Sequence, residues 1–211
     1  MPDASWPTRL VYWAGGHATG LPAWRRRGVF TVVVVAWLVF EFVMRVRQRM
    51  KAQGPASPDP SAVILIPSLV ASVIAAEILG RRGGLPWPGG QVWPLAVGLV
   101  LILAGIGLRA WSIATLGRFF QYQIRVQSGH HMVTGGPYRY VRHPSYTGIA
   151  LILIGIALAC DDVWSLLAVA VLGGVGLWVR IHAEERQLEQ ALGTEYEQFA
   201  ASRKRLVPGV W

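Results

Sequence analysis

The sequence predicts an all-α, polytopic membrane protein with about five transmembrane helices, a C-terminal helical hairpin and an amphipathic tail helix. Of its 211 residues, 53% are hydrophobic and only 15% are charged, and the mean hydropathy is +0.41. These values are typical of membrane proteins rather than soluble domains. The single cysteine, Cys160, excludes an internal disulfide and a cysteine-rich zinc site.

The N-terminal region, residues 1–90, is expected to hold two of these helices and carries no recognisable motif. Its apolar runs cover residues 29–44 and 62–79, and arginines flank the first of them. The linker 54–60 contains three prolines, which remove backbone donors and fix φ, so we expect a loop there. The first residues lack the pattern of a cleaved signal peptide, so the first span is expected to remain in the mature protein.

A third span is expected over residues 92–113, with Trp93 and Trp111 near its ends, where indole rings favour the membrane interface. All three spans approach the roughly 20 residues that a helix needs to cross the hydrocarbon. The polar, basic segment 112–145 that follows reads as a long ordered loop, and such loops often carry functional residues.

Two further apolar runs, residues 146–159 and 163–179, predict a helical hairpin, because only a short acidic break at Asp161 and Asp162 separates them. The first arm is short for a full crossing, so a tilted or partly buried helix is expected. An amphipathic tail helix should follow, with Gly193 interrupting it and a capping box of Thr194 and Glu197 restarting it. Its apolar face is formed by Leu188, Leu192, Tyr196 and Phe199.

The distribution of lysine and arginine predicts the orientation of the chain. Cytoplasmic loops carry an excess of these residues, and most of them lie in the long loop, in the C-terminal tail and after the first span. The loop and the tail should therefore be cytoplasmic, although the cluster at residues 25–27 argues the other way for the first span. The net charge of +9 gathers at the ends of apolar runs, so we expect no nucleic-acid binding.

A helical hairpin returns the chain to the same membrane face, so it brings residues 130–148 and 180–199 together. These blocks combine cations, carboxylates and aromatic rings, a set that suits a zwitterionic ligand such as S-adenosylmethionine. The residues concerned are Arg139, Arg142, His143, Glu184, Glu185, Tyr138, Tyr140 and Tyr146.

The order of the motifs resembles the isoprenylcysteine carboxyl methyltransferase family, within the wider phospholipid methyltransferase superfamily. The matching string is His130-x-Met-Val-Thr-x-Gly-Pro-Tyr138, then Arg142-His143-Pro144-x-Tyr146-x-Gly148, then Glu184-Glu185 after a second apolar arm. The closing LVPGVW also resembles the family's tail, and the resemblance covers residues 93–211. Met132 stands where the family usually has leucine, which is a conservative departure.

The resemblance implies an S-adenosylmethionine-dependent methyltransferase whose core, residues 91–211, holds the cofactor at the cytoplasmic face while a hydrophobic or lipid-linked acceptor enters from the bilayer. The acceptor's identity is left open. Carried over by position, the expected cofactor-site residues are His130, Met132, Gly136, Tyr138, Arg142, His143, Pro144, Tyr146, Glu184 and Glu185.

Glu41, Arg109 and Arg180 are the candidate catalytic residues. Glu41 and Arg109 are ionisable groups about one turn inside the same predicted membrane end, where such groups are costly and usually functional. They can pair with each other or line the acceptor pocket; the alternative is that each snorkels to the interface. Arg180 is close enough to join the cofactor residues. A metal site built from His130, His131 and His143 is not expected, because no carboxylate or cysteine completes the ligand spacing.

Several alternatives remain open at this point. Arg142 and His143 can instead meet lipid phosphates, Glu184 can pair with Arg180 on a solvated helix face, and the tyrosines can form an interfacial belt. At the level of function, membrane sterol reductases carry a similar arginine-histidine-proline loop and use a nicotinamide cofactor. A non-enzymatic membrane subunit that keeps the scaffold is the third reading.

Overall fold

The computed structural model is mainly helical in the part of the chain that it describes. The described residues are 31–32, 34–39, 41–44, 46, 60–90, 92–117 and 132–211. Within them the named helices are α3 (Pro60–Arg82), α4 (Val92–Leu116), the short 3₁₀ helix η2 (Gly136–Arg139), α5 (Pro144–Ala159), α6 (Val163–Leu192) and α7 (Thr194–Ala201). Over these same residues there is no β-strand, so the predicted all-α class is confirmed.

The described residues contain three helices that are long and apolar enough to cross a membrane, namely Ser61–Arg82, Val92–Leu116 and Val163–Leu192. α5 is equally apolar but has only 16 residues, as its short sequence run predicted. The positions described between 31 and 46 are also helical, which agrees with the first predicted span. The polytopic membrane architecture is therefore confirmed.

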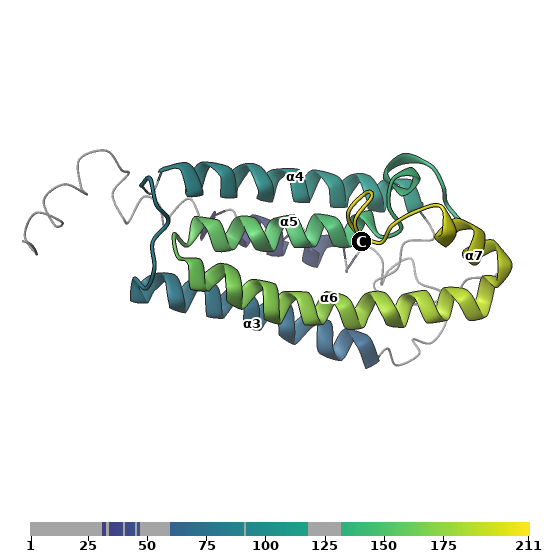
Figure 1. The fold of residues 1–211 in the computed structure, drawn as a ribbon, viewed down its shortest axis with the longest axis horizontal. Helices are drawn as coiled ribbons and strands as arrows, with labels where there is room; N and C mark the ends of the chain where they lie inside the picture. Colours follow the sequence, from purple (N-terminus) through teal and green to yellow (C-terminus); the bar gives the residue numbers. More distant parts are fainter. Residues whose placement is uncertain are drawn as a thin grey trace, which may run out of the picture.

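The long helices lie side by side, with α5 between α4 and α6, and α3 beside α6 (Figure 1). Trp37, from the first predicted span, packs in one core cluster with Ile102 of α4 and with Ile152 and Ile156 of α5. α7 caps one end of the bundle, and the C-terminal segment returns from α7 toward α5 (Figure 1). This end of the bundle therefore gathers segments that are far apart in the sequence.

α4 and α5 approach each other through glycines spaced seven residues apart. A Cβ built on Gly105 would stand 2.5 Å from the backbone oxygen of Gly148, and one on Gly98 would stand 2.6 Å from that of Gly155. Such contacts leave no room for a side chain. Because water cannot drive helices together inside a bilayer, close backbone approach of this kind is a main source of their packing energy.

α3 and α6 use serines opposite glycines in the same way. A Cβ on Gly176 would stand 2.0 Å from the hydroxyl oxygen of Ser68, and Ser72 faces Gly173. Each serine hydroxyl donates back to a carbonyl of its own helix, so no polar hydrogen is left unpaired in the apolar interface. Small residues thus set the spacing of both helix pairs.

The end of the bundle opposite α7 is closed by one buried carboxylate. Asp162, the N-cap of α6, accepts hydrogen bonds from the backbone N–H groups of Ser165 and Leu85, each at 2.8 Å. The N–H of Val163 donates to the Leu85 oxygen at 2.9 Å. The acidic break in the predicted hairpin is therefore a clasp between the α3–α4 loop and the start of α6.

The tail differs from the prediction in two respects. α6 does not end near residue 179 but continues to Leu192, because the polar residues after the membrane can extend a helix into water without a break. The predicted capping box is wrong: Gly193 occupies the N-cap of α7, its φ of 51° suits glycine, and no side chain caps the helix. Thr194 is the first residue of α7.

Candidate active site

Glu185 of α6 is buried and lies between two arginines and a histidine. Its Oε1 accepts from Nη1 of Arg142 at 3.0 Å and lies 3.3 Å from Nε2 of His143. Its Oε2 accepts from Nε of Arg205 at 2.9 Å and lies 2.8 Å from Nη2 of the same side chain. Arg142 and His143 precede α5, whereas Arg205 belongs to the tail, so this carboxylate ties three chain segments together.

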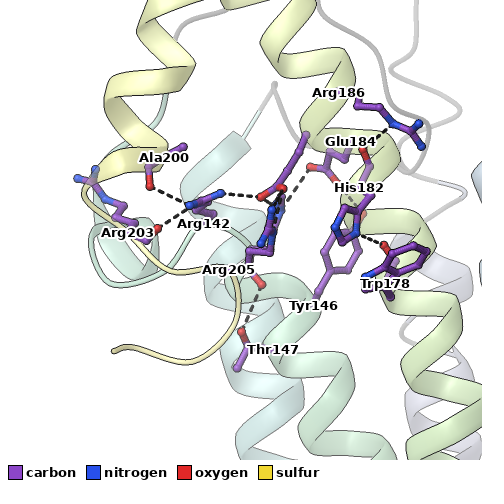
Figure 2. A network of polar contacts seen from close by, with 12 residues as sticks. Arg142, Tyr146, Thr147, Trp178, His182, Glu184, Arg186, Ala200, Arg203 and Arg205 are labelled. Atoms are coloured by element: carbon purple, nitrogen blue, oxygen red, sulfur yellow. Dashed lines mark hydrogen bonds and ion pairs between the residues drawn. The ribbon is translucent and has the colours of Figure 1, made fainter. Parts of the chain in front are cut away.

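The guanidinium of Arg142 is fully engaged with the protein. Besides Glu185, it donates through Nε to the backbone oxygen of Arg203 at 2.8 Å and through Nη2 to that of Ala200 at 2.9 Å (Figure 2). The backbone strengthens the same connection, because residues Val141 and Lys204 form a parallel β-bridge. Arg142 therefore holds the end of α7 and the tail against the start of α5.

Glu184 faces a second, more open part of the site. Its Oε2 accepts from the hydroxyl of Tyr146 at 2.6 Å, and its Oε1 lies 3.9 Å from Nδ1 of His143. The side chain of Glu184 is 27% exposed, compared with 6% for Glu185. His143 thus stands between the two carboxylates, and Glu184 is the one that a ligand can reach.

Tyr146 links Glu184 to the buried Arg180. Nε of Arg180 donates to the Tyr146 hydroxyl at 3.0 Å, and Nη1 donates to the hydroxyl of Ser61 at 2.7 Å. Ser61 lies at the start of α3, so this chain of contacts connects α3, α5 and α6 at one level of the bundle. The expected position of Arg180 beside the cofactor residues is consistent with this arrangement.

Arg109 and Glu41 form a bidentate ion pair inside the helical bundle. Nε and Nη2 of Arg109 donate to the two oxygens of Glu41, the second at 2.8 Å, and Nη1 donates to the hydroxyl of Ser145 at 2.6 Å. Arg109 is buried. The expectation that these two residues can pair is confirmed, and the snorkelling alternative is wrong because the charges satisfy each other in the interior.

η2 places Tyr138 where it interacts both with Glu184 and Tyr146 and with Arg109. Burial is the main reason that the pKa of Tyr138 is raised; the charges of Glu184 and Tyr146 raise it further, and that of Arg109 lowers it. Its hydroxyl therefore senses both the Glu184 side and the Arg109 side of the site. Gly136 is required at the start of η2, since its φ is 53° and a Cβ would stand 2.7 Å from the Thr115 hydroxyl.

The remaining candidates border this site or lie outside the described residues. The N–H of Met132 donates to Glu195 of α7 at 2.7 Å, which attaches the loop to the tail helix. Pro144 is buried and occupies the first position of α5, where a missing N–H costs nothing. His130 falls on residues that the structure does not describe. Among the described residues, no group of three or more metal-ligating side chains occurs.

The structure thus brings together most of the predicted residues at one end of the bundle. Arg142 and His143 are held by protein groups and not presented to lipid phosphates, which contradicts the interfacial alternative. Tyr138 is buried, whereas Tyr140 is exposed and stacks under Arg139 at 4.8 Å. Whether the site residues bind a cofactor remains a prediction.

Four residues of the site were not predicted from the sequence. Ser61 and Ser145 are small polar residues at helix starts, and no pattern marks them as partners of buried arginines. Arg205 was counted only as a tail charge, although its place in a basic run just before the LVPGVW ending is a usable signal. Tyr196 was assigned to an apolar face, yet its buried hydroxyl has no hydrogen-bond partner among the described residues.

Fold and site together define a polytopic helical membrane protein with a mixed-charge polar site at one end of its helices. Residues 96–190 match the model of the isoprenylcysteine carboxyl methyltransferase (ICMT) family. The match spans α5 and most of α4 and α6, and it assigns this part of the chain to the family.

Similar proteins extend this assignment. The protein-S-isoprenylcysteine O-methyltransferase A of Arabidopsis thaliana is 35% identical over 120 residues, which are 56% of this chain and 61% of the relative. The uncharacterized protein YpbQ of Bacillus subtilis (strain 168) is 30% identical over 147 residues, which are 68% of this chain and 83% of YpbQ. The chain thus spans less than two thirds of the length of the Arabidopsis methyltransferase.

A solved structure of the eukaryotic intramembrane Ras methyltransferase ICMT shares the fold. The TM-score is 0.67 at 23% sequence identity, and the alignment covers 88% of this chain and 67% of that chain. At this identity the match establishes a common fold.

Proposed function

We propose that this protein is an integral membrane methyltransferase that uses S-adenosylmethionine to methylate a hydrophobic or lipid-linked acceptor. The observation that carries the proposal is the convergence of His143, Tyr146, Glu184 and Glu185 at one end of the hairpin, in the part of the chain that matches the isoprenylcysteine carboxyl methyltransferase family. The family match gives the reaction class, and the residues of this chain give the place where it would occur.

The residues fit such a cofactor by the chemistry of their donors and acceptors. S-adenosylmethionine would supply an electrophilic methyl group on a sulfonium. Glu184, which is partly exposed, can accept from its ammonium group, and His143 beside it can donate to a carboxylate. The buried hydroxyl of Tyr196 has no hydrogen-bond partner within the described part of the chain, so a ligand or a water molecule would satisfy it.

Arg142 and Glu185 have a different task in this proposal. They bind each other, the tail backbone and Arg205, so we assign them the role of positioning the walls of the site. Gly136, Tyr138 and Pro144 fix the course of the chain into α5. Met132 remains a cofactor-site candidate, because its N–H attaches it to α7 through Glu195. His130 is proposed from the family resemblance alone.

Arg109 is the proposed anion-binding residue for the acceptor, with Glu41 as its partner. The pair contacts Ser145, the neighbour of Tyr146, so it borders the Glu184 side of the site. A carboxylate acceptor that shares the guanidinium of Arg109 would be oriented for in-line displacement and would need no general base. Arg180 would position Tyr146 from the opposite side.

We also propose that the site faces the cytoplasm. The site end of the described helices carries Arg139, Arg142, Arg180, Arg186, Arg203, Lys204 and Arg205, whereas the other end carries Arg81 and Arg82. An excess of positive charge marks the cytoplasmic side of membrane proteins, and cytosolic cofactor would reach the site there.

The proposal is tested by measuring which cofactor the protein binds. Purified protein in nanodiscs should be protected from thermal unfolding by S-adenosylmethionine or its demethylated product and not by NADPH. Transfer of a labelled methyl group should then be measured to S-alkylated cysteine acceptors of increasing chain length. Each buried CH₂ contributes about 0.8 kcal/mol, so four more carbons should tighten binding by roughly 3 kcal/mol until the groove is filled. Protection by NADPH alone would support the sterol-reductase reading, and protection by neither would support a non-enzymatic subunit.

A further inference from the structure

The last nine residues form a compact turn that returns to the bundle. The N–H groups of Leu206 and Val207 both donate to the backbone oxygen of Trp211, at 2.7 Å and 2.8 Å. The hydroxyl of Thr147, in the first turn of α5, donates to the Leu206 oxygen at 2.8 Å. The turn is therefore folded and fixed to α5, and it does not extend away from the helices (Figure 1).

This attachment places the turn at the level of the membrane interface. Ser145 contacts Arg109, two residues before the exposed Trp111, and Tyr146 contacts Arg180, two residues after the exposed Trp178. Two residues along a helix correspond to about 3 Å, and exposed tryptophans mark the boundary between hydrocarbon and headgroups. Thr147 and the turn bonded to it thus lie close to that boundary.

The surface of the turn combines apolar and cationic groups. Val207, Val210 and Trp211 are exposed, with Val210 at 74% of its full accessible area. Lys204 is exposed beside them, between Arg203 and Arg205 in the sequence. The β-bridge of Lys204 with Val141 brings in the neighbouring exposed pair Arg139 and Tyr140. An apolar tip flanked by basic and aromatic side chains is the pattern of segments that lie in an anionic bilayer surface.

We propose that residues 203–211 form an interfacial anchor that inserts its apolar tip among the lipids and binds anionic phospholipid headgroups through the exposed Lys204 and the nearby exposed Arg139. The depth of Thr147 supplies the location, the exposed Val207, Val210 and Trp211 supply the apolar contact, and the positive charge selects an anionic lipid. This inference depends on the membrane fold and not on the proposed methyl transfer.

Site-specific fluorescence tests the anchor. Val210→Cys would be labelled with an environment-sensitive dye and reconstituted in nanodiscs of phosphatidylcholine, with or without phosphatidylglycerol. Glu197→Cys is the matched control, because Glu197 is exposed on α7, beyond the end of the bundle. Quenching would be measured with aqueous acrylamide and with lipids brominated near the headgroup.

With phosphatidylglycerol present, the fluorescence emission of the label at position 210 should shift to shorter wavelength, be quenched by brominated lipid and be shielded from acrylamide. The emission of the label at 197 should stay at longer wavelength and be quenched by acrylamide but not by brominated lipid. Lys204→Gln should lower the ratio of inserted to free turn about fivefold, since one basic residue near an anionic surface contributes about that factor. A label at 210 as open to acrylamide as the control overturns the anchor. An equal response in both lipids overturns the preference for anionic headgroups.

Discussion

Arg205 in the tail forms a hydrogen bond and a close ion pair with one oxygen of Glu185, a carboxylate 20 positions earlier on α6. The contact is shared, because Arg142 and His143 approach the other oxygen of the same side chain. A single buried acid therefore contacts the tail, the start of α5 and, through its own helix, the end of α6.

This arrangement predicts strong coupling between residues 185 and 205. Arg205→Ala and Glu185→Gln should each lower the free energy of unfolding by about 1–3 kcal/mol, and the double variant should cost much less than the sum of the two. The cycle would be measured by thermal or denaturant unfolding in detergent. Arg186→Ala, an exposed change on the same helix, is the control. Additive effects would show that the two residues act independently.

Glu184 is predicted to contribute directly to cofactor affinity. Glu184→Gln keeps an oxygen for the Tyr146 hydroxyl but removes the negative charge that would face an ammonium group. Affinity for S-adenosylmethionine should fall roughly 10- to 100-fold, the range expected for one hydrogen bond to a charged group. Calorimetry would measure it, with the exposed Glu189→Gln on the same helix as control. Equal affinity in the two variants would remove Glu184 from the site.

Loss of the Arg109 side chain is predicted to affect both stability and the acceptor. Arg109→Ala removes the bidentate contact to Glu41 inside the bundle, and breaking such a pair costs about 3–5 kcal/mol. The double variant Arg109→Gln with Glu41→Gln removes both charges and should recover most of that stability. Its methyl transfer should nevertheless stay low, with cofactor affinity nearly unchanged.

Recovery of stability and turnover together in this double variant would assign the pair a purely structural role. Unfolding in detergent, calorimetry with the cofactor and methyl transfer kinetics on the same preparations separate these outcomes. The KM for the acceptor is the decisive quantity, because only a residue that holds the acceptor should raise it.

Two glycines on α4 are predicted to respond in opposite ways to alanine. A Cβ at Gly105 would stand 2.5 Å from the backbone oxygen of Gly148, so Gly105→Ala must push α4 and α5 apart and should cost about 1–3 kcal/mol. A Cβ at Gly107 meets nothing within 4 Å, so Gly107→Ala should be neutral or stabilise by up to about 1 kcal/mol. Unfolding temperatures of the two variants compare them directly. Similar losses in both would refute close glycine packing.

Cys160, between α5 and α6, is predicted to be a poor nucleophile. Burial raises the pKa of its thiol to about 12, and the charges of Glu77 and Asp162 add to the effect. The reactive thiolate is therefore scarce at pH 8, and alkylation should be about a thousandfold slower than for an ordinary cysteine. The rate should rise with pH, because deprotonation is limiting.

The weak reactivity of Cys160 permits cysteine mapping of the orientation without removing it. In intact cells, a membrane-impermeant maleimide should label Leu85→Cys, at an exposed position of the α3–α4 loop, and should label Glu197→Cys only after permeabilisation. The reverse pattern would place the polar site on the outer face.

Most of the fold was predictable because few structures other than a helix are stable for an apolar segment inside a bilayer. The starts of α4 and α6 and the end of α5 agree with the sequence runs, and the convergence of residues 142–146 with 184–185 follows from the hairpin alone. The end of α6 was not predictable in this way, because hydropathy marks where the membrane stops and not where a helix stops.

The pairing of the charged side chains within the site could not be predicted from the sequence. Arg142 and Glu185 carry the right charges for a ligand, yet in the structure they satisfy each other, since the path of the tail decides which cations are near. The seven-residue spacing of Gly98 with Gly105 and of Gly148 with Gly155 is visible in the sequence, but it identifies a helix pair only once the antiparallel match is known.

The clasp at Asp162 sets an order of events during biosynthesis. Leu85, whose N–H it binds, leaves the ribosome 77 residues before Asp162 does. At ordinary translation rates this interval is roughly 4 to 15 seconds. During this interval α4 and α5 are synthesised while the α3–α4 loop still lacks its hydrogen bond to Asp162. The contact between this loop and the start of α6 can form only after the first turn of α6 has been made.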